Sequence, residues 1–305
     1  MLIVVALGGN ALLRRGDAAS DATQRANVER AAHALAPFAR DHRLVITHGN
    51  GPQVGLLALR ESAAARDGTG SGLDVLGAET QGMIGYLIEE AMREVLPRLE
   101  VATLLTQVEV DRADPAFGAP TKPIGPVYDE PTARRLATER GWDIAPDGTG
   151  YRRVVASPEP QRILELPAIR ALLAARFVVV CAGGGGVPVV LDAAGAIEGV
   201  EAVIDKDLAS ALLATHVGAE RLLLLTDVDA VYDDWGTPQA RPIRRATVAE
   251  MRAHTFAAGS MGPKVEAACR FAAAGGIAAI GALEDAQAIL EGTAGTTIVL
   301  GEAFR

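Results

Sequence analysis

The chain has 305 residues, of which 49% are hydrophobic and 4% aromatic, and its formal net charge is −9. This length allows one large α/β domain or two smaller ones, with a core of Ala, Val, Leu and Ile. The acidic balance argues against nucleic acid or an anionic membrane as the main partner, and an anionic substrate would need a local cluster of cations.

Four apolar runs end abruptly in glycine-rich or polar segments, and helix-like stretches lie between them. Because continuous apolar strands alternate with helices, the pattern predicts βαβ crossovers and a mainly parallel sheet covered on both faces. The expected strands are residues 2–7, 44–47, 177–182 and 222–225, and the expected helices are 21–40, 77–96, 206–217 and 263–274.

The apolar N-terminus reads as the first strand, since it lacks a basic segment and runs into Gly8-Gly9-Asn10. No run of about 18 apolar residues occurs, which argues against a membrane span. Cys181 and Cys269 have no CxxC partner, so neither a zinc motif nor a disulfide framework is expected. The expected compartment is the cytoplasm.

Three glycine clusters follow three of the predicted strands. They are Gly8-Gly9, Gly49-Asn50-Gly51 and Gly183 to Gly186. The carboxyl ends of parallel strands meet at one edge of a sheet, where bare backbone N–H groups make a cradle for anions. Tight strand-to-helix turns would explain one cluster. Three together favour phosphate or carboxyl binding.

Residues 111–160 differ from the rest, because they hold 8 of the 16 prolines. Proline is excluded from central strands and helix interiors, so this segment is predicted to leave the sheet. It is either a lid that carries Lys122 or a rigid structural flap.

The basic residues comprise 26 arginines and only three lysines, Lys122, Lys206 and Lys264. Arginine is a broad planar fork, whereas lysine is a compact charge that can follow a moving phosphoryl group. A lysine retained in such a chain is a candidate for a place where arginine would fail.

Two of the lysines stand at predicted helix starts. Asp205 is a plausible N-cap before Lys206, Asp207 suits the first turn, and Pro263 suits the first position of the helix that carries Lys264. A cation there opposes the helix dipole, which makes sense if an anion binds beside it. Asp207 could hold the two lysines apart and keep them charged.

Familiar nucleotide and kinase motifs are missing: there is no Walker P-loop, no dinucleotide fingerprint and no protein-kinase catalytic loop. His48 is the only histidine in a glycine motif. It could be a general base, but a hydrogen-bonded histidine that stabilises its loop is the favoured interpretation. Phosphoryl transfer to an ionised oxygen needs positioning and charge neutralisation rather than a base.

Together these segments closely resemble the carbamate kinases of the amino-acid-kinase superfamily, along nearly the whole chain. The most specific runs are His-Gly-Asn-Gly-Pro-Gln and Thr-Lys-Pro-Ile-Gly-Pro. One departure is Ala257-Ala258, where the family often has proline before the Gly-Ser-Met-Gly-Pro-Lys run. The matching segments are residues 5–11, 48–55, 80–82, 105–108, 120–126, 182–187, 199–207 and 259–264.

The resemblance implies a three-layer αβα sandwich around a mainly parallel sheet of about eight strands, with a small protruding lid. It implies the reversible reaction ATP + carbamate = ADP + carbamoyl phosphate, with Mg²⁺ held largely by the phosphates and by no protein metal site. The chain would be one amino-acid-kinase domain, its part at about 1–175 binding carbamate and its part at about 176–305 binding the nucleotide. A homodimer is implied, and the usual role is ATP synthesis in the breakdown of arginine or purine nitrogen.

The resemblance also assigns residues. Lys206, Lys264 and Lys122 would neutralise the moving phosphoryl group, and Asp207 would orient them. The residues that would line the small-acid site are Gly8, Gly9, Asn10, Gly49, Asn50 and Gly51. Those that would approach the nucleotide are Gly183, Gly184, Asp227, Tyr232 and Met261.

Two other functions remain open from the sequence. One is another superfamily kinase, acting on an N-acylated amino acid or a nucleoside monophosphate. The other is a non-catalytic sensor of carbamoyl phosphate or nucleotide, against which the three lysines and Asp207 speak. The physiological direction and pathway do not follow from the sequence.

Overall fold

The computed structural model describes residues 1–9, 20–64, 71–256 and 261–301. Within them, eight strands form the main sheet in the order β15-β17-β16-β12-β1-β2-β9-β3. All neighbouring pairs are parallel except β16 and β17. The mainly parallel sheet is thus confirmed. Its strands are β1 (Leu2–Leu7), β2 (Arg43–His48), β3 (Val101–Thr103), β9 (Val178–Val180), β12 (Arg221–Thr226), β15 (Arg245–Thr247), β16 (Ile277–Ala282) and β17 (Thr296–Val299).

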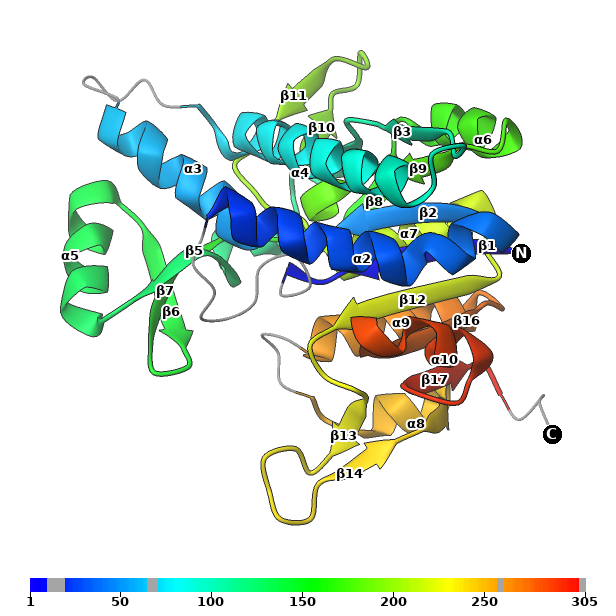
Figure 1. The fold of residues 1–305 in the computed structure, drawn as a ribbon. Helices are drawn as coiled ribbons and strands as arrows, with labels where there is room; N and C mark the ends of the chain where they lie inside the picture. The colour runs from blue at the N-terminus through cyan, green and yellow to red at the C-terminus, as the bar shows by residue number, and fades with distance from the viewer. Residues whose placement is uncertain (10–19, 65–70, 257–260, 302–305) are drawn as a thin grey trace.

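Helices cover both faces of this sheet, as Figure 1 shows. Along β1, Leu2, Val4 and Ala6 pack into one core with helices α6 to α9, while Ile3, Val5 and Leu7 pack into the other with α2, α4 and α10. The strands are buried on both sides, which explains why they read as unbroken apolar runs. The helices are α2 (Asp21–Asp41), α4 (Leu73–Val95), α6 (Leu166–Ala174), α7 (Lys206–Val217), α8 (Val248–Ala253), α9 (Met261–Ala273) and α10 (Ala286–Glu291).

The proline-rich segment does leave the main sheet. Strands β5 (Lys122–Tyr128), β6 (Asp143–Asp147) and β7 (Gly150–Val155) form a separate sheet in the order β5-β7-β6, beside helix α5 (Glu130–Arg140). Figure 1 shows this unit, here called the small sheet unit, projecting to one side. Pro123 and Pro126 lie in β5, an edge strand, where the missing N–H groups break no internal ladder.

The small sheet unit packs at its base on helix α3 (Gly51–Ala64). Val54 and Ala58 of α3 join Ile124 and Val155 of the unit in a third core cluster. Gly55 and Gly125 meet there, since a Cβ at Gly55 would fall 2.0 Å from the Gly125 Cα. This contact fixes the start of β5, and with it Lys122, close to the body of the protein.

The remaining elements are short. A second sheet has the order β11-β10-β4-β8, and β13 and β14 form a hairpin. No helix among the described residues is long and apolar enough to cross a membrane. Their bounds are β4 (Gln107–Val110), η1 (Pro115–Gly118), β8 (Pro160–Ile163), η2 (Gly183–Gly185), β10 (Val187–Leu191), β11 (Ile197–Gly199), β13 (Val231–Asp233), β14 (Arg241–Ile243) and η3 (Leu283–Asp285).

Candidate active site

The three predicted glycine clusters gather at one edge of the main sheet, and two of them follow the neighbouring strands β1 and β2. Gly8 and Gly9 follow β1, and Gly49 follows the neighbouring strand β2. A Cβ at Gly49 would lie 2.9 Å from the Gly9 N and 3.4 Å from the Lys206 Cδ. Any larger residue at position 49 would push the two strand ends apart. Glycine therefore lets two backbone segments and a lysine come together at one point.

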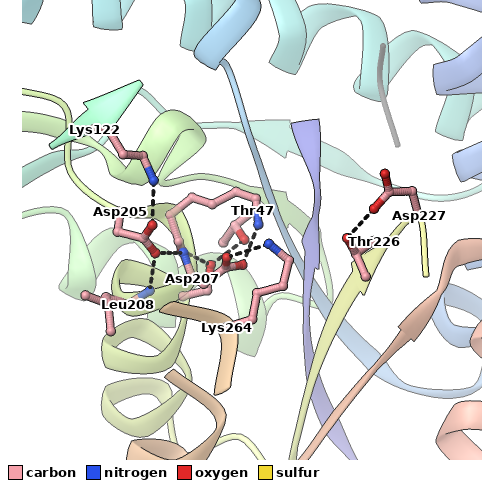
Figure 2. Close-up of polar contacts among 10 residues, drawn as sticks. Thr47, Lys122, Asp205, Asp207, Leu208, Thr226, Asp227 and Lys264 are labelled. Carbon is pink, nitrogen blue, oxygen red and sulfur yellow. Dashed lines mark hydrogen bonds and ion pairs between the residues drawn. The ribbon is translucent and has the colours of Figure 1, made fainter. Parts of the chain in front are cut away.

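The N-terminus of α7 enters this edge, capped as the sequence predicts. The Asp205 Oδ1 accepts hydrogen bonds from the backbone N–H groups of Asp207 (2.9 Å) and Leu208 (3.2 Å). Its other oxygen accepts from the Lys122 Nζ at 2.5 Å. Figure 2 shows that one carboxylate thus caps the helix and also holds the lysine of the small sheet unit.

Asp207 contacts both of the other lysines, and Figure 2 shows Lys264 beside its carboxylate. Its Oδ1 accepts from the Lys206 Nζ and its Oδ2 from the Lys264 Nζ, the latter at 3.0 Å. The side chains of Lys206 and Lys264 are only 10% and 13% exposed. One carboxylate therefore fixes two buried ammonium groups, which come from α7 and α9.

The three charged groups of this triad shift one another's pKa values. Burial alone would raise the pKa of Asp207, but the two ammonium groups outweigh burial and hold that pKa below its usual range. Burial lowers the pKa of Lys206, with Asp207 opposing. Burial also acts on Lys264, but attraction to Asp207 outweighs it and raises the pKa. Asp207 is thus firmly ionised beside two cations.

A buried hydroxyl pair, which the sequence did not suggest, anchors the first turn of α7. The Thr47 Oγ1 of β2 lies 2.7 Å from the Ser210 Oγ, and that hydroxyl donates to the Lys206 carbonyl at 2.5 Å. Both side chains are fully buried. The pair ties the backbone of Lys206 to the strand that carries Gly49. The one sequence feature that could have indicated the hydrogen bond to the Lys206 carbonyl is a serine four residues after a lysine at a helix start.

His48 takes the structural role favoured from the sequence. It is fully buried, and its Nδ1 lies 3.2 Å from the Gly49 carbonyl oxygen. Burial lowers the pKa of His48 from 6.5 to about 4; the hydrogen bond to Gly49 opposes this and the charge of Lys206 adds to it. The ring is thus neutral near pH 7 and braces the glycine turn.

Gly183 and Gly184 do not lie with the other nucleotide candidates. A Cβ at Gly183 would meet the His48 ring at 2.3 Å, and one at Gly184 would meet the Asn50 Nδ2 at 2.1 Å. The reason is strand order: β9 neighbours β2, whereas β12 lies on the far side of β1. They therefore lie beside His48 and Asn50 and away from the segment that follows β12. Asn10, predicted for the small-acid side, lies outside the described residues.

The other nucleotide candidates follow β12 or begin α9. The Asp227 Oδ1 accepts from the Thr226 hydroxyl at 3.1 Å, and its charge helps to raise the pKa of Lys264. The Tyr232 hydroxyl donates to the Asp229 Oδ1 at 2.8 Å. Met261 is the first residue of α9.

The predicted position of Pro263 was wrong, because this proline is the third residue of α9 and not the first. The first four N–H groups of a helix have no partner within the helix, so proline is tolerated there too.

No cluster of three or more His, Cys, Asp or Glu side chains that could hold a metal ion occurs among the described residues.

Comparison with known proteins identifies the family. The family model described as "Amino acid kinase family" matches residues 1–280. A carbamate kinase of Rhizobium meliloti is 52% identical over 302 residues, covering 98% of this chain and 93% of the relative. One of Haemophilus influenzae is 53% identical over 300 residues, covering 98% and 96%. The chain belongs to the amino acid kinase family, among the carbamate kinases.

A solved carbamate kinase agrees in fold. The structure of the Giardia lamblia carbamate kinase bound to AMP-PNP has a TM-score of 0.88 and 40% identity, and covers 98% of each chain. Against this family pattern, the one departure seen in the sequence, Ala257-Ala258, lies outside the described residues, as do Gly259 and Ser260 of the adjoining motif.

Proposed function

We propose that this chain is a carbamate kinase that transfers a phosphoryl group reversibly between ATP and carbamate, giving ADP and carbamoyl phosphate. The observation that carries the proposal is the Lys206–Asp207–Lys264 triad at the glycine-rich sheet edge. The relatives and the solved neighbour named carbamate kinase support the same reaction.

The chemistry follows from charge. A carboxylate oxygen of carbamate forms the new bond to the γ-phosphorus while the bond to the ADP oxygen breaks, so no proton needs to be removed. The difficulty is to bring two anions together, which positioned cations overcome. Lys206 and Lys264 neutralise the transferring group, and Asp207 fixes both ammonium groups before the substrate arrives.

Lys122 would serve the small-acid side. It belongs to the small sheet unit and is 28% exposed, so it is more accessible than the other two lysines. We assign it to carbamate or to the phosphoryl oxygens, with the unit acting as a lid. Gly8, Gly9, Gly49, Asn50 and Gly51 would line this side.

The nucleotide would lie on the β12 side, near Asp227, Tyr232 and Met261. ATP or ADP is the expected nucleotide, and Mg²⁺ bound mainly by phosphate oxygens would neutralise further charge. The carboxylate of Asp227 suits this group, since Mg²⁺ prefers oxygen ligands. The N-terminal part thus handles the acid, and the C-terminal part the nucleotide.

A homodimer is proposed as the assembly. Val75, Met83 and Tyr86 are 46%, 39% and 56% exposed on the outer side of α4. Their helical spacing gathers apolar area on a face that a second copy would bury. Light scattering of the wild type and of Tyr86→Glu tests this. A monomeric wild type would contradict it.

The function is tested by following ATP formation from carbamoyl phosphate, ADP and Mg²⁺. Lys206→Ala and Lys264→Ala should each lower the rate by orders of magnitude. Arg134→Ala is the matched control, because it removes a cation on exposed α5 that pairs with Glu130 and lies over the Tyr151 ring. If the folded wild-type protein forms no ATP, the proposal is refuted. Binding of carbamoyl phosphate without turnover would point to a sensor, and turnover of another acid to another kinase.

A further inference from the structure

The surrounding residues hold the side chain of Asn50 in one position. It is 4% exposed, and a Cβ at Gly184 would fall 2.1 Å from its Nδ2 and 2.5 Å from its Oδ1. The amide therefore rests directly on the backbone of Gly184, whose φ of +66° also favours glycine. Asn50 follows Gly49, the residue that touches Gly9 and approaches Lys206.

Thr80 of α4 fixes the orientation of the Asn50 side-chain amide, that is, the positions of its NH₂ and carbonyl ends. The Thr80 hydroxyl donates its single hydrogen to the Gly77 carbonyl at 2.8 Å. It can then only accept from Asn50, and the Asn50 Nδ2 lies 2.8 Å away. Since a hydroxyl has one hydrogen, the NH₂ end of Asn50 must face Thr80.

The carbonyl end of Asn50 has no hydrogen-bond donor in the described part of the chain. No donor among the described residues bonds to its Oδ1, and that oxygen is not fully enclosed. An asparagine before a helix usually caps the first turn with this oxygen. Here the side chain is diverted to Thr80 and leaves an oriented acceptor in an almost buried position.

We propose that the Asn50 Oδ1 accepts an N–H from the amino group of carbamate or carbamoyl phosphate and so selects this substrate. The inference rests on the proposed function. Carbamate and acetate share one shape and differ in an NH₂ group against a methyl group. A methyl group in this place would displace water from the Asn50 Oδ1 without giving it a new hydrogen bond. An unpaired acceptor is costly, so such a site discriminates strongly against the methyl compound. Thr80 is then a positioning residue, which keeps the acceptor and not the NH₂ group toward the substrate.

The test is the ratio of kcat/KM for carbamoyl phosphate to that for acetyl phosphate, each with ADP and Mg²⁺. Thr80→Val keeps the shape of the side chain but frees the amide to turn over, so the ratio should fall by about tenfold or more. Thr80→Ser restores the hydroxyl and should keep the ratio near that of the wild type. Thr103→Val is the matched control, because this hydroxyl bonds to the Gly85 carbonyl of the same helix.

Asn50→Ala gives a second measurement, in which the acceptor itself is removed. It should lower kcat/KM for carbamoyl phosphate more than for acetyl phosphate. If Thr80→Val and Asn50→Ala lower both values equally, their role is structural and the inference is overturned. A wild type that uses both donors equally well would also overturn it and leave the kinase function standing. A wild type that uses neither donor would overturn the proposed function, and the inference with it.

Discussion

His48 should make the folded protein less stable in mild acid. Its ring is fully buried between the Gly49 carbonyl and Gly183, and burial lowers its pKa from 6.5 to about 4. In the unfolded chain the ring takes up a proton as the pH falls through 6.5. In the folded chain it stays neutral until the pH approaches 4. The unfolded state thus binds more protons in this window, and stability falls as the pH falls.

The magnitude follows from these two pKa values. The loss of unfolding free energy is about 1.4 kcal/mol at about pH 5.5 and about 2.5 kcal/mol at about pH 4.5, relative to about pH 7.5. Below the folded pKa the loss levels off, because both states are then protonated. Other groups titrate in the same range, so the effect must be read as a difference between two variants.

His48→Gln supplies that difference, since glutamine can donate to the Gly49 carbonyl but does not titrate. The unfolding free energy of both proteins would be measured by urea denaturation at several pH values in this window. The wild type should lose about 2.5 kcal/mol more than the variant between about pH 7.5 and 4.5. A difference that stays constant within about 0.5 kcal/mol would refute the reasoning, because His48 would then protonate freely in the folded state.

Three further outcomes are expected. Asp207→Asn leaves two ammonium groups without their carboxylate, so urea denaturation should show a loss of about 3–5 kcal/mol and ATP formation should almost cease. Asp205→Ala should cost about 1–2 kcal/mol and also lower kcat, whereas Ser20→Ala, which removes the cap of α2, should lower stability alone. Gly55→Ala should force α3 from β5, measurable as a loss of about 1–3 kcal/mol with reduced activity, and an unchanged protein would contradict the packing described.

The main sheet was predictable because its strands carry their own signal. β1 and β12 are unbroken apolar runs between glycine or polar segments, and both faces of each are covered. The detour around Lys122 was predictable from proline, which a central strand excludes. The short strands β13 to β15 were not expected, since three residues each carry too little pattern to be read.

The contacts between distant residues could not be read from the sequence. Thr47 and Ser210 are 163 residues apart and meet only because β2 packs beside α7. The placement of Gly183 and Gly184 depended on strand order, which puts β9 next to β2. By contrast, the sequence did indicate that Asp207 acts on two lysines, because a carboxylate next to Lys206 could hold Lys206 and Lys264 apart and keep them charged.

The use of lysine in this cluster follows from how its donors are divided. An ammonium group has three donors, and Lys206 and Lys264 each spend one contact on Asp207, so donors remain for the oxygens of a phosphoryl group. A guanidinium would engage both carboxylate oxygens with its fork, and Asp207 could then hold only one cation. The Cδ of Lys206 also lies close to Gly49, where a broad planar group has little room.

Three lysines and two aspartates leave one net positive charge in the cluster, in a chain of net charge −9. An incoming anion is therefore attracted to this cluster, although the chain as a whole is acidic.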